Sequence, residues 1–234
     1  NGVQFVGGGR LKMAQFRPDT SLNATTVEQY AAMRVRVMRQ VHFSTADQRS
    51  IDLVFFVNGL PVATVELKNP MTGSGVVDAM RQYRETRSPE WPVYRFKGGA
   101  IVHFAVSTDL VSMTTRLAGK DTHFLPFNQG NGGGAGNPIN EHGHDTAYLW
   151  QEVWQRDSWL DLLHRFVHIA KEPGSTDGSK PARETVMFPR YHQLQAVRRL
   201  EAAAREEGPG HSYLVQHSAG SGKSNTIAWT AHSL

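Results

Sequence analysis

The chain has 234 residues, 39% of them hydrophobic, and no cysteine, so it has material for a packed core but none for disulfide bonds or thiolate zinc sites. No apolar run approaches the roughly 20 residues of a membrane span, and the N-terminus lacks the layout of a signal peptide. We therefore expect a cytoplasmic protein with no membrane partner. The formal net charge of +4 is a mild basic excess that is compatible with a DNA partner.

The two ends of the chain indicate a piece of a longer protein. The first residue is Asn1 rather than methionine, and Leu234 falls inside the last helix that we expect. We therefore read the chain as a fragment that is cut at both ends.

The first third of the sequence predicts a helix and then a hairpin. Thr25-Thr26-Val27-Glu28 has capping-box spacing and predicts a helix from Val27 to Gln40. The β-branched and aromatic run Ile51–Val57 predicts a strand, and Pro61–Lys68 predicts the returning strand. Asn58-Gly59 between them is a strong hairpin signal.

The middle of the sequence continues the alternation of helices and strands. Val76–Arg87 has an amphipathic pattern and predicts a helix, and Ala100–Val106 and Val111–Thr115 predict two further strands. Ala147–Ala170 predicts one long helix. Three of its aromatic residues are expected in the core: Trp150, Trp154 and Phe166.

The clearest linker composition lies at Lys171–Arg183, which is rich in Gly, Ser, Pro and charged residues. We place a domain boundary there. The chain then divides into a first domain at residues 1–170, the linker at 171–183, and the start of a second domain at 184–234.

Two acidic residues and a lysine interrupt the apolar strands of the hairpin. Asp52 and Glu66 are able to supply the carboxylate oxygens that Mg²⁺ prefers, and phosphodiester hydrolysis needs such a cation. Glu66 and Lys68 are two residues apart on a strand, so they point to the same face. Lys68 is then placed to orient or deprotonate an attacking water. The alternative is that these charges simply face water at strand ends.

The pairing register decides between these interpretations. Asp52 lies opposite Glu66 only if the hairpin has a three-residue or bulged connection. A plain two-residue Asn58-Gly59 turn places Asp52 opposite Val65, on the wrong face. The metal-site interpretation therefore predicts a three-residue connection or a bulge.

A second motif, Ser218–Ser224, lies between a predicted strand at Ser212–Gln216 and a helix starting near Lys223. In this context backbone N–H groups and a helix N-terminus surround nucleotide phosphates, a role that falls to Gly220 and Gly222. Lys223 is expected to reach the β- and γ-phosphates, and Ser224 to bind Mg²⁺. A Gly-Ser loop without ligand is the alternative. The usual first glycine of the motif is His217 here.

Upstream of this phosphate loop, Phe188–Gln193 precedes a helix predicted at Tyr191–Glu206. In helicase-type motors a glutamine at this place reads the edge of adenine, and we expect that role for Gln193. A solvated residue in the first helical turn is the alternative.

With these motifs in their order and spacing, the chain resembles the R (restriction and translocation) subunit of type I restriction enzymes. The matching stretches are Ser50–Val54, Leu60–Pro70, Asp78–Tyr83, Met113–Leu117, Phe124–Asn128 and Phe188–Gln193 through the phosphate loop.

The resemblance implies an α/β fold: a PD-(D/E)xK endonuclease domain with a mixed central sheet, then the beginning of a P-loop, RecA-like motor of helicase superfamily 2. Asp52 and Glu66 are then metal ligands and Lys68 the catalytic lysine. The implied enzyme is a type I site-specific deoxyribonuclease that cuts double-stranded DNA with Mg²⁺ after ATP-driven translocation. Its implied partners are the modification and specificity subunits.

One departure from the family lies in the helix after the hairpin. Many members carry a glutamine four residues before a tyrosine, but here Ala79 precedes Tyr83 at that distance and Gln82 adjoins it. Tyr83 is therefore either a supporting residue of the site or a core residue. Three arginines of the same helix are either solvated or in contact with DNA phosphates: Arg81, Arg84 and Arg87.

Two other functions remain open. One is a DNA-binding, ATP-dependent motor whose first domain does not cut, and the other is a docking module without enzymatic activity. Metal-dependent nicking of DNA separates the nuclease from both.

Overall fold

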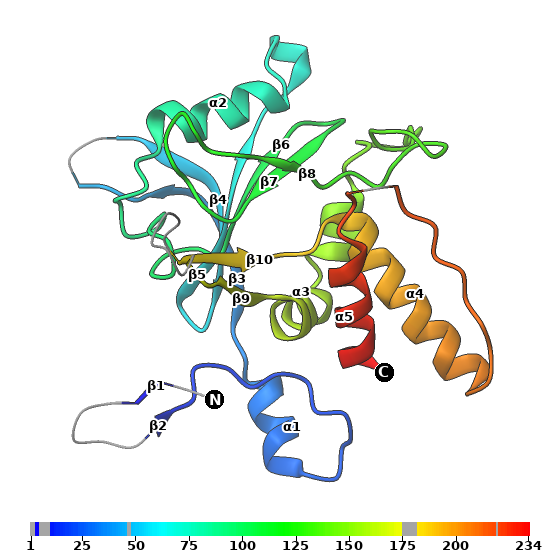
Figure 1. Ribbon diagram of the computed structural model, residues 1–234. Helices are drawn as coiled ribbons and strands as arrows, with labels where there is room; N and C mark the ends of the chain where they lie inside the picture. The colour runs from blue at the N-terminus through cyan, green and yellow to red at the C-terminus, as the bar shows by residue number, and fades with distance from the viewer. Residues whose placement is uncertain (1–2, 5–9, 46–47, 175–181, 219) are drawn as a thin grey trace.

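The computed structural model describes residues 3–4, 10–45, 48–174, 182–218 and 220–234. Its centre is a six-stranded sheet in the order β3-β4-β5-β6-β7-β8 (Figure 1). β5 and β6 are parallel and all other neighbours are antiparallel. This confirms the expected α/β fold with a mixed central sheet. The strands are β3 (Val35–His42), β4 (Ser50–Val57), β5 (Leu60–Leu67), β6 (Val102–Val106), β7 (Val111–Thr114) and β8 (Leu125–Pro126).

Helical segments cover both faces of the sheet. On one face lies α2 (Val76–Thr86), which connects the parallel strands β5 and β6 in the way that a parallel pair requires. Its side chains form a core with residues of the sheet: Val76, Ala79, Tyr83, Ile51, Val54 and Ala105. The larger core lies on the other face, where Phe55 of β4 and Phe104 of β6 pack with aromatic residues from the later part of the chain: Phe127, Trp159, Phe166, Phe188 and Tyr191.

The prediction of a helix from Val27 to Gln40 is wrong. The chain forms α1 (Ala24–Ala31) and then the edge strand β3. Asn23 caps α1, since its side chain accepts a hydrogen bond from the N–H of Thr26 at 3.1 Å. The valines at positions 35, 37 and 41 have the two-residue period and the branched shape of a strand, and pairing with β4 overrides the weaker helical pattern.

The long helix predicted at Ala147–Ala170 is broken into shorter pieces. These are the π-helical turns η2 (Leu149–Val153) and η3 (Leu162–Phe166), the helix α3 (Arg156–Asp161) between them, and the strand β9 (His168–Glu172). Gln155 interrupts the helical run with an extended backbone, at φ −60° and ψ 142°. Phe166 is buried as predicted, but Trp150 is 44% exposed. In the described part of the chain, no helix is long and apolar enough to cross a membrane.

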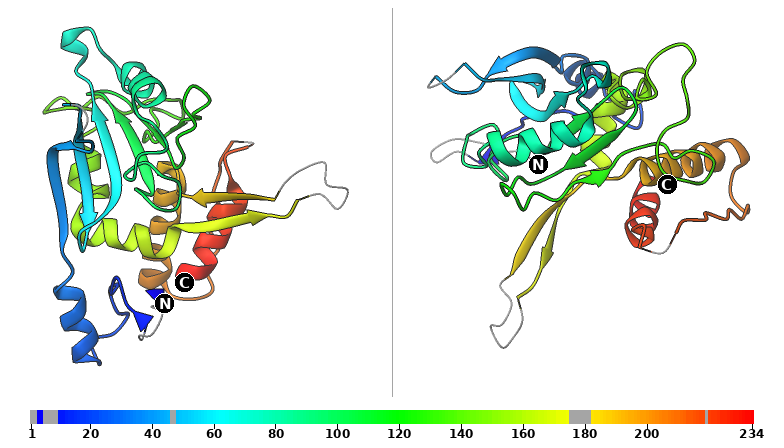
Figure 2. Two further views of the ribbon diagram at one scale, coloured as in Figure 1. Left: turned by 90° about the vertical axis from the view of Figure 1, so that its left-hand side faces the viewer. Right: turned by 90° about the horizontal axis from the view of Figure 1, so that it is seen from above.

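The expected linker at Lys171–Arg183 begins inside one strand and ends inside the strand that pairs with it. β9 pairs antiparallel with β10 (Arg183–Met187), and residues 175–181 lie outside the described residues. The two strands form an arm that projects from the body of the molecule (Figure 2). The described residues close to the N-terminus include a small antiparallel pair, β1 (Val3–Gln4) and β2 (Arg10–Leu11), and a 3-10 turn η1 (Pro70–Thr72) follows β5.

After the arm come α4 (Tyr191–Glu207) and α5 (Lys223–Ser233), both close to the predicted helices. The strand predicted at Ser212–Gln216 is wrong, because this segment is irregular. A strand needs a neighbour for its backbone groups, and none of the described residues pairs with this segment. Leu214 in its centre is 95% exposed. The part of the chain that the structure describes therefore shows no motor sheet beside the phosphate loop.

A polar network is buried between the sheet and α2. The Thr64 hydroxyl lies 2.8 Å from the Tyr83 hydroxyl and 2.8 Å from Nδ1 of His103, and all three residues are almost fully buried. Burial lowers the pKa of His103 to about 3. Tyr83 is therefore a core residue whose hydroxyl has a partner.

We predict that His103 makes the fold sensitive to acid. The unfolded chain binds the proton near pH 6.5 and the folded chain only near pH 3, so stability is lost as the pH falls through this window. The loss by pH 5 is about 2 kcal/mol. In His103→Gln, which keeps a polar group for Thr64, the free energy of unfolding by urea should change less between pH 7.5 and pH 5. An identical pH dependence in both proteins would contradict the buried, neutral histidine.

Candidate active site

The hairpin between β4 and β5 has a two-residue turn. Val57 pairs with Leu60, and the turn residues Asn58 and Gly59 both have positive φ angles, 49° and 86°. Asparagine and glycine are the residues that tolerate this conformation, which explains the strong hairpin signal of the pair. The Asn58 side chain accepts a further hydrogen bond from the N–H of Arg34 at 2.9 Å.

A bulge between residues 55 and 56 corrects the register that this turn alone would give. Beyond the bulge, Leu53 pairs with Val65. The next residues along the two strands, Asp52 and Glu66, therefore stand opposite each other and point to the same face. The bulged connection that the metal-site interpretation required is confirmed.

Asp52 is half-buried and both of its carboxylate oxygens accept hydrogen bonds. The backbone N–H of Leu67 donates to Oδ2 at 2.7 Å. The side chain of Gln40, on the neighbouring strand β3, donates to Oδ1 from Nε2 at 3.2 Å. These two donors fix the plane of the Asp52 carboxylate.

Glu66 is fully buried and ion-paired. Nε of Arg87 donates to Oε1 at 2.7 Å, and Nε2 of Gln82 donates to Oε2 at 2.8 Å. Burial raises the pKa of the Glu66 carboxyl to about 7, and the hydrogen bond from Arg87 is the largest influence in the opposite direction. The charge of Asp52 also raises this pKa, as expected for a carboxylate on the same face.

Gln82 connects the glutamate to the lysine. While its Nε2 donates to Glu66, its Oε1 accepts a hydrogen bond from Nζ of Lys68 at 2.5 Å. The amide of Gln82 therefore fixes the positions of the Glu66 and Lys68 side chains relative to each other. The structure brings together all three residues that the sequence singled out here and adds Gln82, whose position beside Tyr83 was the only sequence signal for it.

Arg87 is also a residue whose role the sequence did not reveal. Its side chain is 3% exposed and donates hydrogen bonds to Glu66 and to the backbone oxygen of Ser50. The interpretation of Arg87 as a contact to DNA phosphates is therefore wrong. Arg84 donates to the backbone oxygen of Thr122. Arg81 pairs with Asp78 on the surface. Amphipathic periodicity did not separate the buried arginine from the two others, because Arg87 follows the last turn of α2.

The donor set fits a hard divalent cation. Two carboxylates share one face, and lone pairs remain on their oxygens beside the hydrogen bonds described above. Mg²⁺ binds through one or two carboxylates and keeps several waters. In the described part of the chain, no group of three or more His, Cys, Asp or Glu side chains is placed to hold a metal, so the candidate ligands number two.

Residues 19–122 match the model of the family described as type I restriction enzyme R protein N terminus. This segment belongs to that family. It contains the whole constellation around Asp52, Glu66 and Lys68. A search of curated proteins finds no match to the chain.

The phosphate loop lies outside the segment that matches the family model. Nζ of Lys223 donates across the loop to the backbone oxygens of His217 and Ser218, at 3.4 Å and 3.2 Å. Gly220 and Gly222 have positive φ angles of 71° and 81°, and Ser224 is exposed in the first turn of α5. The roles of these residues toward a nucleotide and Mg²⁺ stay predictions.

Gln193 contacts the phosphate loop directly. Its Nε2 donates to the backbone oxygen of Gly222 at 2.9 Å, and its Oε1 accepts from the N–H of Arg190 at 2.9 Å. A Cβ at Gly222 would lie 2.6 Å from Nε2 of Gln193, so this approach needs glycine. Gln193 is 4% exposed and is not a solvated residue, whereas its role toward adenine stays a prediction.

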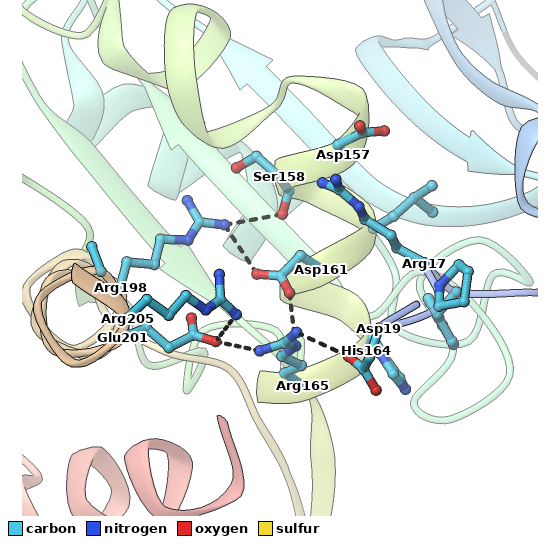
Figure 3. Close-up of a pocket in the computed structure, with 14 residues that line it drawn as sticks. Arg17, Asp19, Asp157, Ser158, Asp161, His164, Arg165, Arg198, Glu201 and Arg205 are labelled. Carbon is cyan, nitrogen blue, oxygen red and sulfur yellow. Dashed lines mark hydrogen bonds and ion pairs between the residues drawn. The ribbon is translucent and has the colours of Figure 1, made fainter. Parts of the chain in front are cut away.

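A separate cavity of about 600 Å³ lies between the α3–η3 segment, α4 and residues 16–19. Figure 3 shows Arg165 at its centre, paired with Asp161 at 3.0 Å and with Glu201. Arg198 also reaches Asp161, at 3.6 Å. Because these charges are paired with one another, they form a polar contact between α4 and the α3–η3 segment.

We predict that Arg87→Ala lowers the melting temperature by about 10 °C, because breaking a buried ion pair leaves the Glu66 carboxylate without its partner. Arg81→Ala is the matched control on the same helix, since its pair with Asp78 is exposed to solvent and should change the melting temperature little. Calorimetry of the three proteins checks this. Equal melting temperatures for Arg87→Ala and the wild type would show that Arg87 does not balance a buried charge.

Proposed function

We propose that this chain carries the nuclease site of a type I restriction enzyme R subunit, which hydrolyses phosphodiester bonds of double-stranded DNA with Mg²⁺. One observation carries the proposal. The bulged register of a segment in this family puts Asp52 and Glu66 on one face, with Lys68 joined to Glu66 through Gln82.

Asp52 and Glu66 are the residues that would hold Mg²⁺. The cation would neutralise charge on the scissile phosphate and lower the pKa of a bound water. Before a metal binds, Arg87 compensates the charge of Glu66 in its buried position. Burial alone would favour the neutral, protonated form of Glu66, and Arg87 favours the charged carboxylate.

Lys68 supplies the second function of the site. Its ammonium group stays next to Glu66 because the Gln82 oxygen holds it. From this position Lys68 orients the attacking water and balances negative charge that develops on the phosphate. Gln82 takes part as a positioning residue, since its side chain contacts both Glu66 and Lys68.

The phosphate loop supports the second half of the proposal, in which DNA cleavage is coupled to ATP-driven translocation. Gly220, Gly222 and Lys223 would cradle the phosphates of ATP, and Ser224 would bind its Mg²⁺. Gln193 would contact the adenine. The proposed partners are the modification and specificity subunits of a type I restriction complex, with the DNA as substrate.

We predict that Lys68→Ala abolishes DNA cleavage by the full-length subunit in the assembled complex and leaves ATP-driven translocation unchanged. The ammonium acts only at the phosphate that is cut. Lys171→Ala, an exposed lysine on the β9–β10 arm, serves as the control and should cut normally. Cleavage by Lys68→Ala at the wild-type rate would show that DNA is cut without the site at Asp52, Glu66 and Lys68.

We predict that Lys223→Ala stops translocation and, with it, cleavage, because the variant lacks the charge that stabilises the β- and γ-phosphates during transfer. The measurement is displacement of a labelled triplex ahead of the moving complex, together with ATP hydrolysis. The loop lysine is exposed, so the melting temperature should change little. Translocation that persists in Lys223→Ala would remove the motor from the proposal.

A further inference from the structure

Gln40 has a backbone conformation that its residue type rarely adopts. Its φ angle is +50°, although it lies inside the strand β3. In the described residues, Asn58 and Lys97 are the other non-glycine residues with positive φ. Asparagine tolerates this region in a turn, but glutamine has no such preference. A strained residue persists only where the surrounding structure holds it.

Both ends of the Gln40 side-chain amide form hydrogen bonds with residues of β4. Its Nε2 donates to Oδ1 of Asp52 at 3.2 Å, and its Oε1 accepts from the hydroxyl of Ser50 at 2.7 Å. The β3–β4 ladder has Arg39 opposite Leu53 and Val41 opposite Ile51, so Gln40 stands opposite Asp52. The hydrogen bond from Ser50 fixes which end of the amide faces the carboxylate.

We propose that Gln40 is a positioning residue for the metal ligand Asp52, and this inference rests on the proposed function. With the backbone N–H of Leu67 on Oδ2 and the Gln40 amide on Oδ1, each oxygen has one donor and keeps lone pairs for a cation. The carboxylate then meets Mg²⁺ in a fixed orientation. The strain in β3 is retained because it places the amide beside Asp52.

A purely structural role of Gln40 and a positioning role predict opposite results for the variant Gln40→Gly. If Gln40 only ties the edge strand to β4, its loss should destabilise the protein and leave metal binding intact. If Gln40 positions Asp52 at the expense of backbone strain, glycine should relieve the strain and impair the metal site. Gln40→Gly therefore separates the two roles.

The experiment compares the melting temperature without metal and the affinity for Mg²⁺ by calorimetry in the chain itself. For Gln40→Gly we expect a melting temperature equal to the wild type or about 2–4 °C higher, together with Mg²⁺ binding that is weaker by roughly tenfold. Gln40→Ala keeps the strain and should lose the affinity without the gain in melting temperature. Met38→Gly is the matched control on the same strand and should melt lower with unchanged Mg²⁺ binding.

Two results would overturn the inference: wild-type affinity for Mg²⁺ in Gln40→Gly, or a melting temperature as low as that of Met38→Gly. Asp52→Ala tells this failure apart from a failure of the proposed function. If Asp52→Ala binds Mg²⁺ as tightly as the wild type, the metal site itself is wrong. If Asp52→Ala loses binding while Gln40→Gly retains it, only the role of Gln40 is wrong.

Discussion

The whole site depends on the register of β4 against β5. The side chains of a strand alternate between its faces, so a slip by one residue would send Asp52 to the opposite side of the sheet from Glu66. The Asn58-Gly59 turn by itself produces that slip, and the bulge at residues 55 and 56 compensates for it. The tight turn and the bulge therefore place Asp52 and Glu66 on one face only in combination.

A second constraint follows from where this register places Glu66. The residue is enclosed between the sheet and α2, where a carboxylate is costly without a partner. Arg87 provides the compensating charge, and Gln82 provides a hydrogen bond to the second oxygen. Asp52 is less buried and has hydrogen-bond donors from β3 and β5 where Glu66 has an arginine. The two carboxylates thus differ in environment although they face each other.

The sequence predicted those parts of the structure in which local chemistry and tertiary context agree. The hairpin, α2 and α4 carry clear signals, and the charges of Asp52, Glu66 and Lys68 interrupt strongly apolar strands. The errors arise where pairing decides: Val35–His42 becomes a strand because β4 is there, and Ser212–Gln216 does not, because no described strand accompanies it. The roles of Gln82 and Arg87 rest on contacts between residues far apart in sequence, which no local pattern encodes.

The segment after the β9–β10 arm is not separate from the core of the sheet. Phe188, Tyr191 and Leu194 belong to the same buried cluster as Phe104 on β6, and Trp229 of α5 donates a hydrogen bond to the backbone oxygen of Phe166 at 3.0 Å. The composition of residues 171–183 still marks a boundary in the sequence, and that boundary stays a prediction. In space, however, α4 completes the core on one side and touches the phosphate loop through Gln193 on the other. A shift of this helix would therefore disturb the packing on one face of the sheet, and the paired charges around Arg165 oppose such a shift.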